Sequence, residues 1–442
     1  MKAIKLFLFS LLISQANYAS LYFNENIKTT INNDFKSNYK LANEYISSEK
    51  YLDAIPVIEY LDSISPSNSN INYLLGFCYY NASVDKKKAI TYLGKAILNV
   101  KAEYKSSYKE ICAPPLAFYF LARSYHSVYM FKEASKNFEK YKTFLKQNSN
   151  SIKETNRWLE ICQNGVKLMK STQNSKIEIF DSTISLRNSS YSFVATDDNN
   201  ALIFSPNIDI SDKKSDNMCY YYMFSDEVNW SKPKKLDNDF TNINAVITNK
   251  SFIDNLKKKE FFISQNDNNN KDIYCISFNN DKFSEAIKLG SNVNTKADEI
   301  HACLSPDMNT LFFSSNKDGG YGGYDIYSSE KLSDGSWSKP YNLGPKVNTV
   351  YDDQTPFIAN DGVTLYFSSK GHNTLGGFDV FISTLSYEGL WSQSENLGYP
   401  INTPLDDMFY TLSSNEKKAF YSSSKNGENN IYIISYTFIQ PK

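Results

Sequence analysis

The second half of the chain repeats one pattern of short segments, and this repeat limits the possible architecture more than any other feature. Leu311–Ser315 matches Leu365–Ser369, and Gly322–Tyr327 matches Gly376–Phe381. One segment of each repeat begins with an aromatic residue, at intervals of 53, 54 and 54 positions: Trp230, Phe283, Trp337 and Trp391. Short strands separated by turn residues at a fixed period of this length are typical of a β-propeller.

The number of blades follows from the Phe/Tyr-Ser pairs that end one strand of each repeat. Five such ends occur: Ile203–Ser205, Phe262–Ser264, Phe313–Ser315, Phe367–Ser369 and Tyr421–Ser423. The last repeat stops after Ile431–Tyr436, and the β half begins with the apolar segment Lys176–Phe180. A ring closes if this first segment supplies the missing strand of the last repeat, which leaves no long free edge. Five blades are therefore expected, with six as the alternative if the early strands form their own blade.

Between residues 28 and 170 the apolar residues follow a helical period. Three helix-turn-helix units can be superposed on small residues that would let two antiparallel helices approach closely. These positions are Ala42, Tyr45, Ala54 and Ile58, then Gly76, Tyr79, Ala89 and Leu93, then Ala122, Tyr125, Ala134 and Phe138. A final helix over Ser151–Met169 is expected to cap the stack.

Both halves resemble known repeat families. The helical spacing resembles the tetratricopeptide repeat, although the second unit shifts by one residue and the usual early tryptophan is missing. Ser305–Asp307, Leu311–Ser315 and Tyr324–Tyr327 resemble the TolB-type β-propeller repeat, a relative of the WD-repeat blade. The expected order is a signal peptide (1–19), tetratricopeptide-like repeats with a capping helix (28–170), a linker (171–176) and a TolB-like β-propeller (177–442).

This combination resembles a group of bacterial envelope proteins, some of which are parts of type IX secretion and gliding machinery. Members of the group commonly continue into a peptidoglycan-binding OmpA-like domain. This chain ends at Lys442 directly after the blades, so the resemblance does not imply direct peptidoglycan binding.

The first residues resemble an export signal. Lys2 and Lys5 precede the apolar run Leu6–Ile13, and Ala16 and Ala19 offer cleavage points. The run is shorter than the roughly 20 residues of a membrane span, and no cysteine precedes Cys78 to carry a lipid. We therefore expect an exported protein, periplasmic or associated with the outer membrane, without a transmembrane segment.

Charge and cysteine content narrow the function further. The chain has 47 Lys+Arg against 48 Asp+Glu and only three arginines, which disfavours nucleic acid as a partner. Three of its six cysteines lie in each half, so complete pairing would need a bond between the halves. We expect free thiols, with a Cys78–Cys112 bridge as the first exception to consider. No Cys-x-x-Cys pair occurs, which disfavours a zinc or redox site.

Two repeated features are candidate sites. An acidic pair follows each Asn-Thr at intervals of 54 positions: Asp298 and Glu299, Asp352 and Asp353, Asp406 and Asp407. These carboxylates could bind calcium at one rim of the ring; the favoured interpretation is that they accept backbone N–H bonds in a turn. The four aromatic residues that head the repeat segments could stack on sugars or pack between blades, and packing is the favoured interpretation.

The sequence gives no pattern for catalysis. The aspartates of the Asp-Ile/Val pairs, Asp272, Asp325 and Asp379, are expected to be structural hydrogen-bonding partners. The histidines His126, His301 and His372 are far apart in the sequence, and the glycines of 319–323 lack the Lys-Ser/Thr of a phosphate loop. We therefore expect a non-enzymatic scaffold that binds envelope proteins and needs no cofactor; the alternative is a glycan- or peptide-binding module for uptake or surface attachment.

Overall fold

The computed structural model describes residues 31–83, 85–170, 176–180, 193–195, 201–204, 221–224, 234–235, 243–244, 259–267, 270–279, 282–413, 416–425 and 429–436. The chain divides into two compact units, Met1–Cys162 and Gln163–Lys442. The expected signal peptide lies outside the described residues, as do residues 171–175 of the expected linker. The division itself falls inside the last helix of the helical half.

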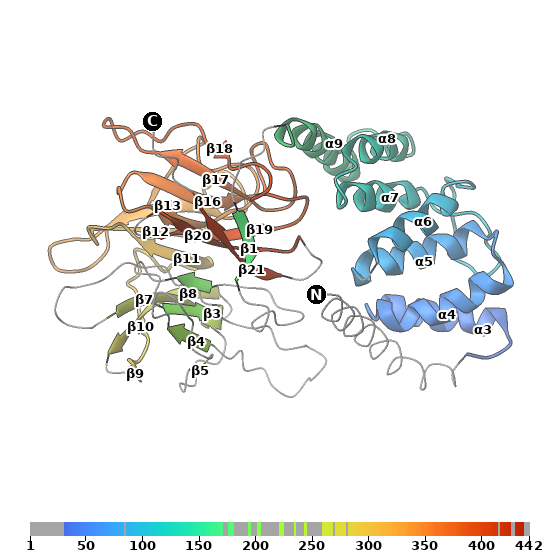
Figure 1. Ribbon diagram of the computed structural model, residues 1–442, viewed down its shortest axis with the longest axis horizontal. Coiled ribbons are helices and arrows are strands. Elements are labelled where there is room, and N and C mark those ends of the chain that lie inside the picture. Colours follow the sequence, from blue (N-terminus) through green and yellow to red (C-terminus); the bar gives the residue numbers. More distant parts are fainter. Residues whose placement is uncertain are drawn as a thin grey trace, which may run out of the picture. The chain divides into compact units, whose positions relative to one another are not determined.

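The described part of the first half contains seven helices that follow one another in consecutive pairs (Figure 1). They are α3 (Phe35–Ser47), α4 (Tyr51–Ile64), α5 (Ser69–Ala82), α6 (Lys86–Ala96), α7 (Leu116–His126), α8 (Phe131–Lys142) and α9 (Asn150–Leu168). Side-chain caps explain several starts. Asp34 accepts the backbone N–H of Ser37 at the start of α3, and Asn68 accepts those of Asn70 and Ile71 at the start of α5.

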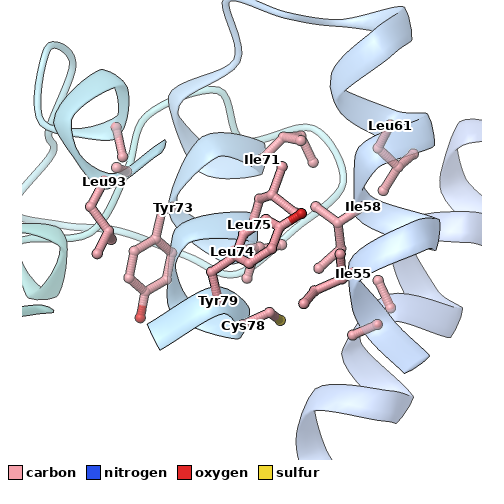
Figure 2. Close-up of a cluster of buried hydrophobic side chains, with 14 of the residues drawn as sticks. Ile55, Ile58, Leu61, Ile71, Tyr73, Leu74, Leu75, Cys78, Tyr79 and Leu93 are labelled. Carbon is pink, nitrogen blue, oxygen red and sulfur yellow. The ribbon is translucent and has the colours of Figure 1, made fainter. Parts of the chain in front are cut away.

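The helices pack through the small residues that the spacing singled out. Ala42, Ala54, Ala89, Ala122 and Ala134 are all buried. Gly76 of α5 faces Leu93 of α6 so closely that an added Cβ would lie 2.6 Å from the Leu93 Cγ. Figure 2 shows the adjoining core, in which Ile55 and Ile58 of α4 point toward α5 and its Cys78. None of the helices that the structure describes is both long and apolar enough to cross a membrane.

The described strands of the second half form antiparallel sheets that succeed one another along the chain (Figure 1). The first sheet contains β2 (Phe193–Ala195), β3 (Ala201–Phe204), β4 (Tyr221–Phe224) and β5 (Lys234–Lys235). The second contains β6 (Ile243–Asn244), β7 (Lys259–Asp267), β8 (Asn270–Asn279), β9 (Lys282–Phe283) and β10 (Ile287–Lys288). The third contains β11 (Glu299–Leu304), β12 (Thr310–Ser315), β13 (Asp325–Glu330) and β14 (Tyr341–Asn342). The fourth contains β15 (Asp353–Ile358), β16 (Thr364–Ser369), β17 (Asp379–Thr384) and β18 (Glu395–Asn396). The fifth contains β19 (Asp407–Leu412), β20 (Lys418–Ser423), β21 (Asn430–Ser435) and β1 (Lys176–Ile179).

Four of these sheets have the four strands of a typical propeller blade, and the second has a fifth strand, β9, paired with β8. The structure therefore shows a helical region followed by a β-propeller. In the fifth sheet β1 pairs with β21, with Ile177 opposite Ile434 and Lys176 opposite Ser435. The first segment of the β half thus completes the last repeat, as the sequence predicted. It does not start a sheet of its own, which the six-blade alternative required.

The first strands of the third, fourth and fifth sheets share an irregular backbone. Each pairs with its neighbour through a register shift, at Ile300/Cys303, Gln354/Phe357 and Met408/Thr411. At each shift one residue that is not glycine has a left-handed backbone: His301 (φ 57°), Thr355 (φ 53°) and Phe409 (φ 58°). These residues are 54 positions apart, so the bulge belongs to the repeat.

None of the five cysteines that the structure describes forms a disulfide: Cys78, Cys112, Cys162, Cys275 and Cys303. The exception we considered, a Cys78–Cys112 bridge, is wrong. Cys78 is buried in the core of the helical unit, where burial raises the pKa of its thiol to about 12. Cys219 lies outside the described residues.

Candidate binding surfaces

The repeated Asp-Ile/Val aspartates hold the loops of their own sheets. Asp325 accepts the backbone N–H of Tyr321 at 2.6 Å and an N–H of the Asn342 amide at 2.7 Å. Asp379 does the same with Leu375 and Asn396, both at 2.7 Å. Asp272 is buried as well, and its carboxylate pairs with the Lys288 ammonium at 2.7 Å. Burial raises the pKa of Asp379 to about 7, although its hydrogen bonds oppose this shift.

The first member of each acidic pair links one sheet to the next. Asp352, just before β15, accepts the backbone N–H of Tyr324 at 3.2 Å, and Asp406, just before β19, accepts that of Phe378 at 2.8 Å. Asp298, just before β11, accepts the N–H of Lys271 at 2.9 Å. These carboxylates therefore replace a missing strand partner at each junction between sheets.

The second member of each pair is buried and binds the threonine of the preceding Asn-Thr. Glu299 accepts the Thr295 hydroxyl at 2.7 Å, and Asp407 accepts the Thr403 backbone N–H at 2.6 Å. Asp353 accepts the Thr349 backbone N–H at 2.5 Å. Burial raises the pKa of Asp353 to about 7 and that of Asp407 well above its ordinary value.

In all three pairs the carboxylates accept backbone N–H groups or bind a nearby threonine, as expected if the acidic pairs have a structural role in turns. Within the described ranges, no group of three or more His, Cys, Asp or Glu side chains is arranged to hold a metal ion. Calcium binding by these six carboxylates stays the less favoured hypothesis. Calorimetric titration of the isolated protein with calcium tests it.

The repeated aromatic residues lie in the core wherever their side chains are described. Trp337 and Trp391 are 8% and 7% exposed and pack in the hydrophobic clusters of neighbouring sheets. Their backbones bridge to Lys331 and Leu385. Trp230 lies outside the described residues, and the Phe283 side chain does too. Trp337 and Trp391 thus pack between strands and present no ring for sugar stacking.

The histidines occupy three separate environments. His126 is buried between Phe131 and Trp158, with ring centroids 5.2 Å away in both cases. His372 contacts Phe381, and its Nε2 lies 2.8 Å from the Val347 carbonyl oxygen. His301 lies against Phe409 at 5.4 Å, and burial lowers its pKa to about 3.

One hollow on the propeller differs from the repeat and was not predicted. It has a volume of about 560 Å³ and is lined by Asn270, Thr295–Asp298 and Asn316–Asp318. We call it the rim hollow. Its lining comes from the start of β8 and from the loops before β11 and after β12, so it lies where the second and third sheets meet.

A second unpredicted surface lies on the helical unit around Arg123 of α7. The Arg123 guanidinium carbon lies 3.7 Å from the Trp158 ring centroid of α9 and 6.0 Å from that of Tyr80 on α5. Its Nη1 donates to the Tyr119 hydroxyl at 3.0 Å. Phe120 packs on Tyr80 at 5.3 Å. We call Tyr80, Tyr119, Phe120, Arg123 and Trp158 the Arg123 cluster; all five side chains are partly exposed.

Comparisons with known proteins assign the chain to no family. No protein-family model matches the chain. No curated protein matches it either. Among solved structures it is similar to TolB from Acinetobacter baumannii, at 12% identity and a TM-score of 0.36, over 65% of this chain and 71% of that one. It is also similar to an endo-arabinase from Bacteroides thetaiotaomicron, at 13% identity and a TM-score of 0.41, over 58% and 96%. An α-L-arabinofuranosidase from Lactobacillus brevis is similar at 12% identity and a TM-score of 0.39, over 57% of this chain and 91% of that one. These values carry no argument about function.

Proposed function

We propose that this protein is a non-enzymatic scaffold of the bacterial cell envelope that binds protein partners through its helical unit and its propeller. The observation that carries the proposal is the Arg123 cluster. Aromatic and arginine side chains are the types most enriched at the energetic centres of protein interfaces. Here four aromatic rings and one arginine from three helices share one partly exposed surface.

The charge of Arg123 supports a partner-binding role. No carboxylate of the described residues forms an ion pair with it, whereas Arg157 of α9 pairs with Glu160 at 2.9 Å. A guanidinium has five N–H donors, and one of them bonds Tyr119. The remaining donors, held in place by the Trp158 ring, are pre-oriented for acceptors of a partner protein.

We also propose the finer architecture expected from the sequence: tetratricopeptide-like helix pairs and TolB-like blades, as the resemblance implies, with five blades in the ring, as the count of strand ends indicates. The β1–β21 pairing supports ring closure, and so does the contact between β19 of the fifth sheet and β2 of the first. A closed ring protects its sheet edges and presents its loops on two faces, a form that suits binding.

Export to the periplasm or the outer membrane is part of the proposal and rests on the amino-terminal sequence. Cleavage is expected after Ala16 or Ala19. Amino-terminal sequencing of the envelope form tests this, and an intact Met1 would contradict it. A place in secretion or gliding machinery is proposed on the family resemblance, with envelope proteins as partners.

The helical surface is tested by affinity purification from envelope extracts with cross-linking. The full chain should capture membrane or periplasmic proteins, and Arg123→Gln should lose them. Lys136→Gln on α8 is the matched control, because Lys136 is an exposed cation outside the cluster. If Arg123→Gln keeps every partner and its melting temperature, the Arg123 cluster is not the binding surface.

A second candidate function is a glycan- or peptide-binding module for uptake or surface attachment. The rim hollow favours it, because a concave site lined by several polar side chains fits a small ligand better than a flat protein surface.

A further inference from the structure

The rim hollow lies at the one described junction where the repeat is interrupted. At the next junction, between the third and fourth sheets, the glycines after β12 lie directly on the segment before β15. A Cβ added to Gly322 would lie 2.5 Å from the carbonyl oxygens of Thr349 and Tyr351, and the Gly323 N–H donates to the Tyr351 carbonyl at 3.3 Å. Gly376 and Gly377 repeat this arrangement against Thr403 and Leu405.

No such glycine loop is possible between the second and third sheets. Residues 316–324 connect β12 to β13, whereas residues 268–269 alone separate β7 from β8. The Asn270 amide takes over the contact of the missing loop. Its Nδ2 donates to the carbonyl oxygens of Thr295 and Ala297 at 3.1 and 3.2 Å. These are the counterparts, 54 positions earlier, of the Thr349 and Tyr351 carbonyls.

The backbone at this junction is therefore satisfied, and the surface above it is open. The stability of the fold requires only that the backbone groups at this junction are hydrogen-bonded, and the Asn270 amide already provides this. The fold does not require the open surface above them. Features that follow the repeat period are explained by the fold, but this departure from the period is not. It creates a hollow of about 560 Å³.

The lining offers hydrogen-bond donors and acceptors, and it contains both positively and negatively charged side chains. Asp298 is already occupied, because its Oδ1 accepts the Lys271 N–H and its Oδ2 accepts the Tyr324 hydroxyl at 2.8 Å. The Asn316 Oδ1 accepts the Asp298 N–H at 2.8 Å, which leaves the Asn316 Nδ2 to donate. Lys296 and Asp318 are exposed, and no described residue bonds their charged groups. Lys317 stands with its ammonium 3.8 Å from the Tyr327 ring centroid.

We propose that the rim hollow binds a neutral oligosaccharide through Lys296, Asn316, Lys317 and Asp318. The charges of the two lysines in the lining, Lys296 and Lys317, balance those of its two aspartates, Asp298 and Asp318. The hollow therefore favours neither an anionic nor a cationic ligand. A sugar hydroxyl both donates and accepts, and thus satisfies an ammonium, an amide and a carboxylate in one site. A peptide would need apolar pockets for its side chains, and Ala297 is the single apolar residue of the lining.

The inference rests on the second candidate function, and its failure can be separated from failure of the scaffold proposal. The residues involved belong to the propeller, whereas the scaffold test uses Arg123 of the helical unit. Variants of the rim hollow should keep every envelope partner that the full chain captures through Arg123.

The test is a glycan array of neutral, anionic and cationic oligosaccharides probed with the full chain, followed by calorimetric titration with the strongest neutral binder. Asp318→Asn and Lys296→Ala should each weaken binding about tenfold, the usual effect of losing a hydrogen bond to a charged group. Glu388→Gln and Lys346→Ala, which remove exposed charges elsewhere on the propeller, should leave it unchanged.

A third variant fills the hollow without removing any ligand group. Ala297→Tyr installs the residue found at the equivalent position of the next repeat, Tyr351, and should abolish binding while the melting temperature stays the same. The proposal is overturned if no neutral oligosaccharide binds, if anionic or cationic glycans or peptides bind in its place, or if Asp318→Asn, Lys296→Ala and Ala297→Tyr leave binding intact.

Discussion

Asn348 holds Ile326 as a strand neighbour would. Its Oδ1 accepts the Ile326 N–H at 2.7 Å, and its Nδ2 donates to the Ile326 carbonyl oxygen at 2.9 Å. Asn402 and Val380 repeat the arrangement in the fourth sheet, and so do Asn294 and Ile273 in the second. Just beyond the short β14, the Leu343 N–H still donates to the Ile326 carbonyl at 3.1 Å, and the Asn348 amide supplies the acceptor for the Ile326 N–H. This explains the Asn of the repeated Asn-Thr pair, because only an amide both accepts and donates in this geometry.

Asn348→Asp should destabilise the propeller by about 1–3 kcal/mol, because the Ile326 carbonyl keeps only the Leu343 N–H as a donor and the Asn342 Oδ1 loses the Asn348 N–H. The expected result is a lower denaturant midpoint with an unchanged slope. Gln393→Glu, the same chemical change at an exposed position, is the control and should stay close to the parent protein. Equal midpoints for Asn348→Asp and the parent would mean that the amide contacts do not contribute to stability.

The buried carboxyls predict how stability depends on pH. Burial raises the pKa of Asp353 and of Asp379 to about 7, against an unfolded value of about 3.9. The folded state then binds more protons than the unfolded state between these values, so stability is present at low pH and is lost as pH rises toward 7. His301 opposes this, since burial lowers its pKa to about 3 and stability from that group is lost on acidification. Burial also raises the pKa of Asp407, so three carboxyls make stability fall with rising pH and one histidine opposes them. The net effect is therefore a loss of stability as pH rises.

The free energy of unfolding of the propeller should therefore fall between about pH 5 and about pH 7, by up to about 1.4 kcal/mol per pH unit for each buried carboxyl. Chemical denaturation followed by circular dichroism at a series of pH values measures this. Asp353→Asn removes one titrating group and should flatten the dependence, while Glu388→Gln should not. Stability that rises steadily over this range would contradict the prediction.

Two helical glycines should respond in opposite directions to the same substitution. Gly76→Ala would place a Cβ against Leu93 and should cost about 1–3 kcal/mol through overpacking. Gly94→Ala meets no atom within 4 Å and should stabilise α6 by up to about 1 kcal/mol. Thermal unfolding of both variants, read at a helical wavelength, gives the comparison. Two melting temperatures shifted the same way would show that α5 and α6 are not packed this closely.

The sequence predicts the periodic parts of this molecule and misses the aperiodic ones. Repeat spacing predicts two contacts, the packing of Gly76 near Ala89 and the pairing of Lys176–Phe180 with Ile431–Tyr436. It does so because a repeated fold needs the same residue type at the same place. The rim hollow depends on what β7–β8 lacks, a loop of the length found in the next repeat. That signal is present in the sequence as a short hairpin, but its meaning depends on which carbonyls Asn270 reaches. The Arg123 cluster joins three helices through ring contacts that no spacing records.

The last prediction concerns the β1–β21 pairing, on which ring closure depends. The Phe180 N–H donates to the Ile431 carbonyl at 2.9 Å. Since alternate residues of a strand point their N–H groups the same way, Glu178 also donates toward β21, opposite Ile433. Glu178→Pro removes this donor at an exposed side-chain position and should cost at least about 1 kcal/mol. Glu178→Ala keeps the donor and is the control. With the edge of β21 loosened, the proline variant should melt at a lower temperature and aggregate more readily, as size-exclusion chromatography with light scattering would show. A proline variant that melts with the alanine control and stays monomeric would mean that β1 does not close the ring.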